Sequence, residues 1–359
     1  MMTIGAHVTY SGSLLAASLT ILSTNHPEDH FIIFSAAPLA DLPANCTPVM
    51  ISPKPANRLL LFYWYNYRLP GLLKKYNADL FISEAGLLSI KSELPQYLYF
   101  SDDRFEAGTV YFKKNFKSSL LRAKKIFTTE TFIAEALRRQ YHVPEEKTQT
   151  IYYGFTVGTG HNLSGTLIKE KFTGGDDYFI CPVTESAVPH LIVLLKAYSE
   201  LKNRQKTAMK LVLLNTLFRE DLIPGFNHYK YRDDVKIIPL TAKNALALFP
   251  NAYAMISLSD YFPGNDTMIA LANGIPLIVK DNVKNRSLFG EAALYAPVSE
   301  TALSEKMQLL YKDEHLKNSL AEKGTLLIKR YDAQKTASAL WDGLTDNISA
   351  LPLKKIPAT

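Results

Sequence analysis

A polar turn between an apolar run and a helical pattern is the part of the sequence best suited to bind an anion. The apolar run ends at Leu258, residues 259–266 are mostly polar, and a helix is expected to begin near Thr267. Asn265 or Asp266 can cap that helix, and the N–H groups of a helix N-terminus attract phosphate groups. A capping carboxylate would compete for the same donors. From spacing alone, an ordinary strand–turn–helix crossover is the stronger interpretation.

Aromatic and basic side chains alternate over residues 55–76. The aromatic ones are Phe62, Tyr63, Trp64, Tyr65 and Tyr67, and the basic ones are Arg58, Arg68, Lys74 and Lys75. This mixture suits an anionic membrane surface or a nucleic-acid strand. It equally fits a helix packed on its sheet with tyrosine hydroxyls and lysine amines in water. Packing is the favoured interpretation, contact with the inner membrane face comes second, and we expect no nucleic-acid partner.

The motifs behind the commoner chemistries of α/β enzymes are missing. There is no Gly-x-Gly-x-x-Gly, Walker loop, His-Glu-x-x-His or Gly-x-Ser-x-Gly pattern, and the first strand–helix turn offers only Gly12. The eight histidines lack metal-ligand spacing, and two cysteines are too few for a disulfide scaffold or a four-cysteine zinc site. These absences argue against a nicotinamide oxidoreductase and a P-loop kinase, and we expect no metal.

Short β-branched or aromatic runs alternate with longer amphipathic stretches almost throughout the chain. The first series of expected strands covers residues 3–8, 30–34, 47–52, 79–83, 96–101, 125–129 and 148–153. The second covers residues 178–183, 210–215, 235–240, 253–258, 276–280 and 294–296. Short apolar runs joined by helix-length segments predict parallel sheets with helices on both faces. The fold class is therefore α/β.

The length and composition fit two globular domains. The chain has 359 residues, 47% of them apolar, and 40 Lys and Arg against 34 Asp and Glu give a net charge of +6. We expect Rossmann-like domains at 1–155 and 177–330 facing each other across a cleft, a glycine-rich linker at 156–176, and a last helix at 331–350 that crosses back to the first domain. No long apolar run and no signal-peptide pattern is present, so we expect a cytoplasmic protein.

Several segments, in this order, are similar to those of a known family. They are Thr-Thr-Glu-Thr at 128–131, Ile-Tyr-Tyr-Gly at 151–154, Leu-Leu-Lys-Ala-Tyr at 194–198 and Ala-Leu-Ala-Asn-Gly-Ile-Pro-Leu-Ile at 270–278. Their order and spacing over nearly the whole chain resemble glycosyltransferase family 4, the group 1 retaining glycosyltransferases of the GT-B fold. Further segments, such as Ala-Asp-Leu-Phe-Ile-Ser at 78–83, resemble a bacterial subgroup of this family.

The resemblance implies transfer of a sugar from a nucleotide-sugar to a glycan or lipid-linked acceptor, with retention at the anomeric carbon, in bacterial polysaccharide or glycoconjugate synthesis. The first domain would hold the acceptor, with Gly12, Ser101 and Asp102 on that side, and Ser101 stands where the family has a histidine. The second domain would hold the nucleotide, whose departing diphosphate needs cations and helix N-termini against it. The nucleotide-sugar is a substrate, and no cofactor is implied.

Several positions that are charged in the family are neutral in this sequence. Thr184 and Pro189 stand at the places of a phosphate-binding arginine and lysine, and neither can replace a cation. Tyr261 and Ile269 stand at the places of two glutamates, unless a one-residue insertion brings Asp260 to the first. The resemblance thus implies a degenerate donor site. Its expected residues are Asp260 for catalysis and Thr184, Gly264, Asn265, Thr267, Lys280 and Lys284 for donor binding.

Two functions from different classes remain open. The first is an atypical retaining glycosyltransferase that uses Asp260 together with Lys280 or Lys284. The second is a catalytically inactive protein of the same fold that acts as a binding or scaffolding subunit, for instance for an active partner glycosyltransferase. The enzyme is the favoured hypothesis, because a cleft can recruit cations from other loops.

Overall fold

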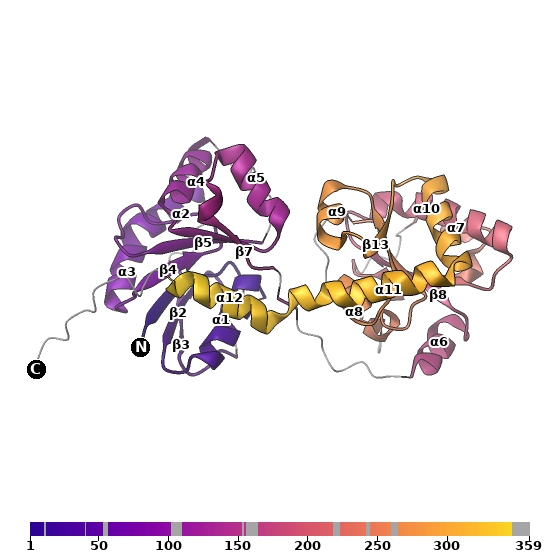
Figure 1. The fold of residues 1–359 in the computed structure, drawn as a ribbon, viewed down its shortest axis with the longest axis horizontal. Coiled ribbons are helices and arrows are strands. Elements are labelled where there is room, and N and C mark those ends of the chain that lie inside the picture. Colours follow the sequence, from indigo (N-terminus) through magenta and orange to yellow (C-terminus); the bar gives the residue numbers. More distant parts are fainter. Residues whose placement is uncertain are drawn as a thin grey trace, which may run out of the picture. The chain divides into compact units, whose positions relative to one another are not determined.

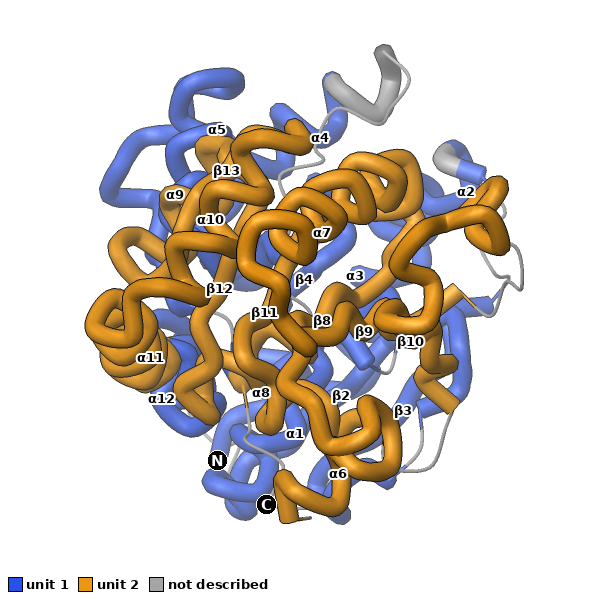
Figure 2. The backbone as a smooth tube through the Cα atoms, turned by 90° about the vertical axis from the view of Figure 1, so that its right-hand side faces the viewer, with its two compact units in different colours: residues 1–154, 331–359 blue, residues 155–330 orange. Residues whose placement is uncertain are grey.

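The structure is a computed structural model that describes residues 1–10, 12–39, 41–52, 57–101, 110–152, 154–155, 164–217, 223–241, 245–259 and 265–346. The chain divides into two compact units, which Figure 2 shows in different colours. Unit 1 is Met1–Gly154 with Tyr331–Thr359, and unit 2 is Phe155–Arg330. Each unit contains one sheet whose described strands are all parallel, with helices packed on it (Figure 1).

Unit 1 is built on a seven-stranded sheet in the order β3-β2-β1-β4-β5-β6-β7. The strands are β1 (Thr3–His7), β2 (His30–Ser35), β3 (Cys46–Met50), β4 (Leu80–Ser83), β5 (Gln96–Phe100), β6 (Lys125–Thr128) and β7 (Thr148–Thr150). Successive side chains of a strand point to opposite faces, so Phe31 and Ile33 join one core cluster while Ile32 and Phe34 join the other. Both faces of this sheet are therefore buried, which explains its nearly continuous apolar strands.

The helices of unit 1 cover the two faces of its sheet. The core on one face includes α2 (Arg58–Tyr63), α3 (Leu69–Lys75), α4 (Val110–Arg122) and α5 (Thr131–Tyr141), and the core on the other includes α1 (Leu14–Asn25) and α12 (Ala333–Thr345). Figure 1 shows α12 beside α1, although the two are more than 300 residues apart. Ala337, Leu340 and Leu344 are fully buried there. The prediction that the last helix packs on the first domain is confirmed.

A π-helical turn interrupts the single helix expected at residues 57–76. It is η1 (Trp64–Arg68), and it lies between α2 and α3. The wider turn brings Trp64, Tyr65 and Asn66 inside together, each at most 2% exposed. Asn66 Oδ1 accepts a hydrogen bond from the backbone N–H of Ile90 at 2.8 Å. The packing interpretation thus describes this turn, whereas Tyr63 and Tyr67 face solvent.

Unit 2 is built on a six-stranded sheet in the order β10-β9-β8-β11-β12-β13. The strands are β8 (Tyr178–Val183), β9 (Lys210–Asn215), β10 (Val235–Pro239), β11 (Ala254–Ser257), β12 (Leu277–Lys280) and β13 (Ala293–Ala296). The longer helices are α6 (Gly165–Thr173), α7 (Leu191–Gln205), α8 (Asn265–Ala272), α9 (Val283–Phe289), α10 (Glu300–Lys312) and α11 (Glu314–Ile328). The strand positions agree with the sequence prediction to within two residues.

The segment predicted as a linker contains a helix, which is a correction to the sequence analysis. Helix α6 occupies residues 165–173 of the predicted 156–176 linker and belongs to unit 2. Ile168 is buried, and Lys169 pairs with Asp177 at 2.6 Å. Two of the glycines in this segment lie at the ends of the helix, because Gly165 is its first residue and Gly174 takes a left-handed conformation with φ of 68° as its C-cap.

Candidate functional site

The order of strands in unit 2 reverses between β8 and β11. From β8 the chain adds β9 and β10 on one side, and it then adds β11, β12 and β13 on the other. At such a switch point, the loops that leave the carboxyl ends of the two strands go to opposite faces, and ligands bind in the crevice between them. The carboxyl ends of β8 and β11 are therefore where a ligand site is expected in this unit.

Hydroxyl groups join the two loops at this switch point. Ser186, in the loop after β8, and Ser259, in the loop after β11, lie with their Oγ atoms 2.8 Å apart. Thr184 Oγ1 is 3.2 Å from Ser186 Oγ, and Thr216 donates to the carbonyl of Val183 at 2.6 Å. Thr184 is an expected donor residue, Ser259 opens the polar turn singled out in the sequence without an assigned role, and Ser186 was not predicted. The positions of the two serines directly after two predicted strands were the available signal.

Two helical starts flank these hydroxyls. The carbonyl of Thr184 accepts from the N–H groups of Ala187 and Val188, and this tight turn leads to Pro189, which is exposed. Helix α8 begins with Asn265 and Asp266, and Asp266 Oδ1 accepts from the N–H of Thr267 at 2.8 Å. The Asp266 carboxylate thus already accepts from one of the N–H groups that an anion could use at the start of α8.

Burial governs the electrostatics at the start of α8. It raises the pKa of the Asp266 carboxyl, although the Thr267 N–H group acts in the opposite direction. Burial, assisted by the charge of Asp266, raises the pKa of the Cys181 thiol on β8 to about 12. Cys181 is therefore a neutral thiol at pH 7, unsuited to act as a nucleophile.

The cations proposed for the donor site lie on and after β12. Lys280 ends that strand and Lys284 is in the first turn of α9, both partly buried and one strand away from β11. Asn282 caps α9, and the Asn285 amide donates to the carbonyl of Lys280 at 2.7 Å. Arg286 is held by Asp281 in a bidentate ion pair of 2.6 and 2.8 Å. Lys280 and Lys284 thus lie at the carboxyl end of the strand next to β11.

Several predicted site residues fall outside the described part of the chain, and no position is assigned to them. These are Asp260, Gly264 and Asp102, together with Tyr261. Of the other predicted acceptor-side residues, Ser101 follows β5 and is partly buried, and Gly12 lies exposed before α1. Ile269, at the place of a family glutamate, is a partly buried residue of α8.

Unit 1 has an equivalent switch point, between β1 and β4, and its polar groups are different. Glu84 follows β4, and its Oε1 accepts hydrogen bonds from the hydroxyl of Thr9 at 2.6 Å and from the N–H of Thr9. The Ser13 hydroxyl caps α1 by accepting from the N–H of Ala16 at 3.2 Å. Burial raises the pKa of Glu84 above its usual value in spite of the bonds from Thr9. Sequence reasoning missed Glu84, which is 75 residues from Thr9.

A buried hydrogen-bond chain lies behind Glu84. His7 Nδ1 is 2.5 Å from the Tyr65 hydroxyl, and that hydroxyl is 2.7 Å from Ser83 Oγ. All three residues are at most 5% exposed. Burial lowers the pKa of His7 to about 4 and raises the pKa of Tyr65, so both are neutral at pH 7. This chain ties the carboxyl end of β1 to that of β4 and to the π-helical turn.

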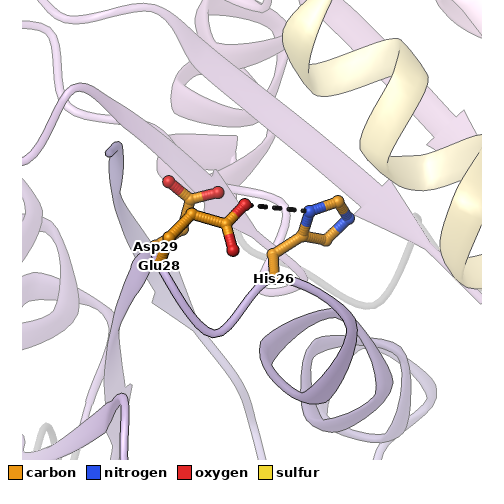
Figure 3. Close-up of side chains that lie close together, drawn as sticks. All are labelled: His26, Glu28 and Asp29. Carbon is orange, nitrogen blue, oxygen red and sulfur yellow. Dashed lines mark ion pairs between the residues drawn. The ribbon is translucent and has the colours of Figure 1, made fainter.

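Three potential metal ligands gather near the start of β2 (Figure 3). Among the described residues, His26, Glu28 and Asp29 form the one group of three whose ligand atoms lie within 4.8 Å. His26 Nδ1 is 3.7 Å from Glu28, and its ring stacks on Trp341 of α12 at 3.7 Å. Asp29 accepts from the N–H of Met2 at 2.6 Å. These contacts hold α12 and the first residues of the chain against the segment between α1 and β2. They explain why the three side chains lie close together without a bound metal.

The chain resembles solved structures over nearly its whole length. No protein-family model and no curated protein sequence matches it. A glycosyltransferase from Rickettsia africae is 14% identical with a TM-score of 0.75, covering 98% of this chain and 99% of its own. HepE from Anabaena, solved in complex with UDP-glucose, is 14% identical with a TM-score of 0.71, covering 96% and 100%. A Listeria monocytogenes protein assigned as a UDP-N-acetylglucosamine 2-epimerase is 11% identical with a TM-score of 0.68, covering all of both chains.

These likenesses show the fold. The chain has a GT-B-like fold, shared with the Rickettsia africae glycosyltransferase and with HepE, and its two parallel-sheet α/β units have seven and six strands. The fold class predicted from the sequence is confirmed. Because a glycosyltransferase and a protein assigned as an epimerase share this fold, the reaction must be argued from side chains.

The stability of unit 1 should fall on acidification because of His7. The pKa of its imidazole is about 4 in the folded unit and 6.5 in an exposed histidine, so between these values the unfolded chain binds the proton more strongly. The free energy of unfolding should therefore decrease by about 3 kcal/mol from pH 6.5 to pH 4 on account of His7, and this contribution should be constant above pH 6.5.

Urea unfolding at pH 7 and pH 4.5, followed by tryptophan fluorescence, checks this. The two tryptophans of the chain, Trp64 and Trp341, both lie in unit 1 and report on that unit. His7→Asn, which keeps a polar group within reach of Tyr65, should show a weaker loss of stability on acidification than the wild type. The matched control His142→Asn changes an exposed residue with φ of 56° and should leave the loss unchanged. An equal loss in wild type and His7→Asn would contradict the argument.

Proposed function

We propose that this chain is a glycosyltransferase that takes a nucleotide-sugar as substrate, with the nucleotide held by unit 2 at the β8–β11 switch point. The observation that carries the proposal is the 2.8 Å contact between Ser186 and Ser259, which puts polar groups from both loops at the place where open parallel sheets bind ligands. HepE, which shares the fold, was solved with UDP, with UDP and glucose, and with UDP-glucose. No cofactor or metal has a role in this proposal.

The proposed donor chemistry depends on stabilising a departing diphosphate. Negative charge develops on that group as the sugar–oxygen bond breaks, and cations or helix N–H groups lower the barrier. Lys280 and Lys284 supply the positive charge, and the hydroxyls of Thr184 and Ser186 supply neutral donors. Asp260 takes the place of the longer family carboxylate. We propose that the sugar is transferred with retention, in bacterial polysaccharide or glycoconjugate assembly.

A second candidate function is supported by the residues at two of the family's cation positions. Thr184 hydrogen-bonds to Ser186, and Pro189 is exposed and has no N–H to donate. A site without these charges still holds neutral parts of a nucleotide, but it stabilises a diphosphate leaving group less. The alternative is therefore a catalytically inactive subunit that keeps the fold, binds a nucleotide-sugar weakly or not at all, and supports a partner glycosyltransferase.

Calorimetric titration of the full chain with UDP-, GDP-, TDP- and ADP-sugars tests the proposal. One of them should bind with a micromolar Kd. Lys280→Ala or Lys284→Ala should raise that Kd about tenfold, because each removes a charge-assisted contact to phosphate. The matched control is Lys312→Ala at the end of α10. The carbonyl of nearby Leu310 accepts from the Tyr253 hydroxyl just before β11, so this part of α10 lies at the amino ends of the strands. Because the proposed site is at the carboxyl ends, the control should bind like the wild type.

Two outcomes of this titration discriminate the alternatives. If no nucleotide-sugar binds at millimolar concentration while the protein is demonstrably folded, the transferase proposal fails. If a nucleotide-sugar binds and is consumed by transfer or slow hydrolysis, the enzyme is supported over the inactive subunit. Binding without any turnover, in the presence of a broad set of glycan acceptors, supports the inactive subunit.

We also propose that unit 1 makes peripheral contact with an anionic membrane. None of the helices in the described part of the chain is long and apolar enough to cross a bilayer. The rings of Tyr63 and Tyr67 stack at 5.1 Å and are about half exposed, and the Lys91 amine lies 3.9 Å above the Tyr67 ring. Leu59 is 65% exposed one turn earlier, and Arg68 is exposed beside Tyr67. Exposed aromatic and apolar side chains next to cations suit an anionic lipid surface.

Vesicle flotation tests the membrane proposal. The protein should float with vesicles that contain anionic lipid and less so as salt is raised, because the basic side chains contribute through a screened attraction. The double change Tyr63→Ser with Tyr67→Ser should reduce flotation several-fold. Leu326→Ser, which removes an equally exposed apolar side chain from α11 of unit 2, is the control. Flotation that is absent, or that is equal with neutral vesicles, would end the proposal.

A further inference from the structure

We infer that Glu84, Thr9 and Tyr10 form a carbohydrate subsite in unit 1, in which the Glu84 carboxylate accepts a hydrogen bond from a sugar hydroxyl. The inference rests on the proposed function, because it places an acceptor sugar on unit 1, and it names the residues that would hold it. It is argued from the position of Glu84, from the kind of bonds it makes, and from the exposed side chains of the loop beside it.

Glu84 lies at the place where parallel sheets of this kind bind ligands, the carboxyl ends of the strands at the switch point. It directly follows β4 at the point where the strand order reverses between β1 and β4. Its backbone N–H donates to the carbonyl of His7 at 3.2 Å, which extends the β1–β4 pairing up to the carboxylate. The buried chain of His7, Tyr65 and Ser83 lies just behind it. The carboxylate is thus held at the carboxyl edge of the sheet by a rigid support.

The hydrogen bonds of Glu84 explain where its side chain lies, but they do not require a charged carboxylate at this position. Its Oε1 accepts two bonds from Thr9, and an amide oxygen would accept both of these bonds equally well. Burial raises the pKa of this carboxyl, and no ion pair to Glu84 is found within the part of the chain that the structure describes. A partly buried carboxylate without a cation costs stability. A ligand hydroxyl that donates to the carboxylate would offset this cost through a charge-assisted bond.

Three described residues that follow β1 beside Glu84 are exposed to solvent, and one of them is aromatic. Thr9 and Gly12 are exposed, and Tyr10 is 59% exposed. A Cβ atom added at Gly12 would lie 3.4 Å from the Tyr10 ring, so the ring packs over the glycine. A flat exposed ring covers the C–H face of a pyranose, while a carboxylate and hydroxyls bind its O–H groups. Gly12 was predicted as an acceptor-side residue, and in this arrangement its lack of a side chain leaves room for the Tyr10 ring to pack against it.

Saturation-transfer NMR with four sugars tests the subsite on the full chain. The probes are the methyl pyranosides of glucose, galactose, mannose and N-acetylglucosamine. At least one should bind to the wild type, and Glu84→Gln should raise its Kd about tenfold or more, because it removes the charge and keeps an acceptor for Thr9. Tyr10→Ser, at an exposed position where the fold does not depend on the ring, should weaken binding by a similar factor. Glu135→Gln on the exposed face of α5 is the matched control and should bind like the wild type.

Each outcome supports or overturns the inference. It is overturned if no pyranoside binds to the wild type, or if Glu84→Gln and Tyr10→Ser both bind like Glu135→Gln. UDP-glucose titration of the same variants separates this result from the donor proposal, since Glu84→Gln should leave the nucleotide Kd unchanged. Sugar binding that depends on Glu84 in a protein that binds no nucleotide-sugar would keep the subsite and remove the transferase. If a nucleotide-sugar binds but no pyranoside does, the donor proposal is kept and the subsite is rejected.

Discussion

In both sheets the first strand of the unit, β1 or β8, lies in the interior of the sheet. The chain adds the next strands on one side of it and the remaining strands on the other side. Right-handed crossovers then send the connections from the first strand and from its later neighbour to opposite faces, so that their loops part at the carboxyl edge. Backbone hydrogen bonds end at this edge, and side chains must join the loops across it. Ser186 and Ser259 do so in unit 2, and Thr9 and Glu84 do so in unit 1. The candidate sites follow from this topological constraint.

The two units join their loops with groups of different charge. Unit 2 uses neutral hydroxyls, and Lys280 and Lys284 lie one strand further along. Lys202 and Lys210 of the same unit lie at the other end of the strands, where they pair with Asp234 at 2.9 and 2.6 Å just before β10. Unit 1 uses a carboxylate whose pKa burial raises. The difference fits an anionic ligand on unit 2 and a neutral, hydroxyl-rich ligand on unit 1.

The sequence predicted most of the fold because apolar periodicity survives without tertiary information. The strands of both sheets and the buried positions Ala337, Leu340 and Leu344 follow from local patterns. The π-helical turn at Trp64 does not, because the gain that offsets its poorer geometry comes from burial against strands far away in the chain. The same is true of the pairing of Thr9 with Glu84. At the candidate site, the sequence predicts Thr184 from the family resemblance, Thr267 from the expected helix start, and Lys280 and Lys284 from their places near the end of an expected strand. Ser186 and Ser259 also follow expected strands, but only the structure shows that their hydroxyls meet, and the same holds for Glu84 and Thr9.

The central claim is that the carboxyl ends of β8 and β11 hold a nucleotide, and hydrogen–deuterium exchange with saturating UDP-glucose tests it most directly. If a nucleotide binds there, exchange should slow at the backbone amides of residues 184–190 and 265–269, on the two helical starts that follow β8 and β11. The account predicts unchanged exchange at the amino ends of the same strands, around Asp177 and Tyr253. Protection confined to the amino ends, or none at the two helical starts with the ligand demonstrably bound, would contradict the account.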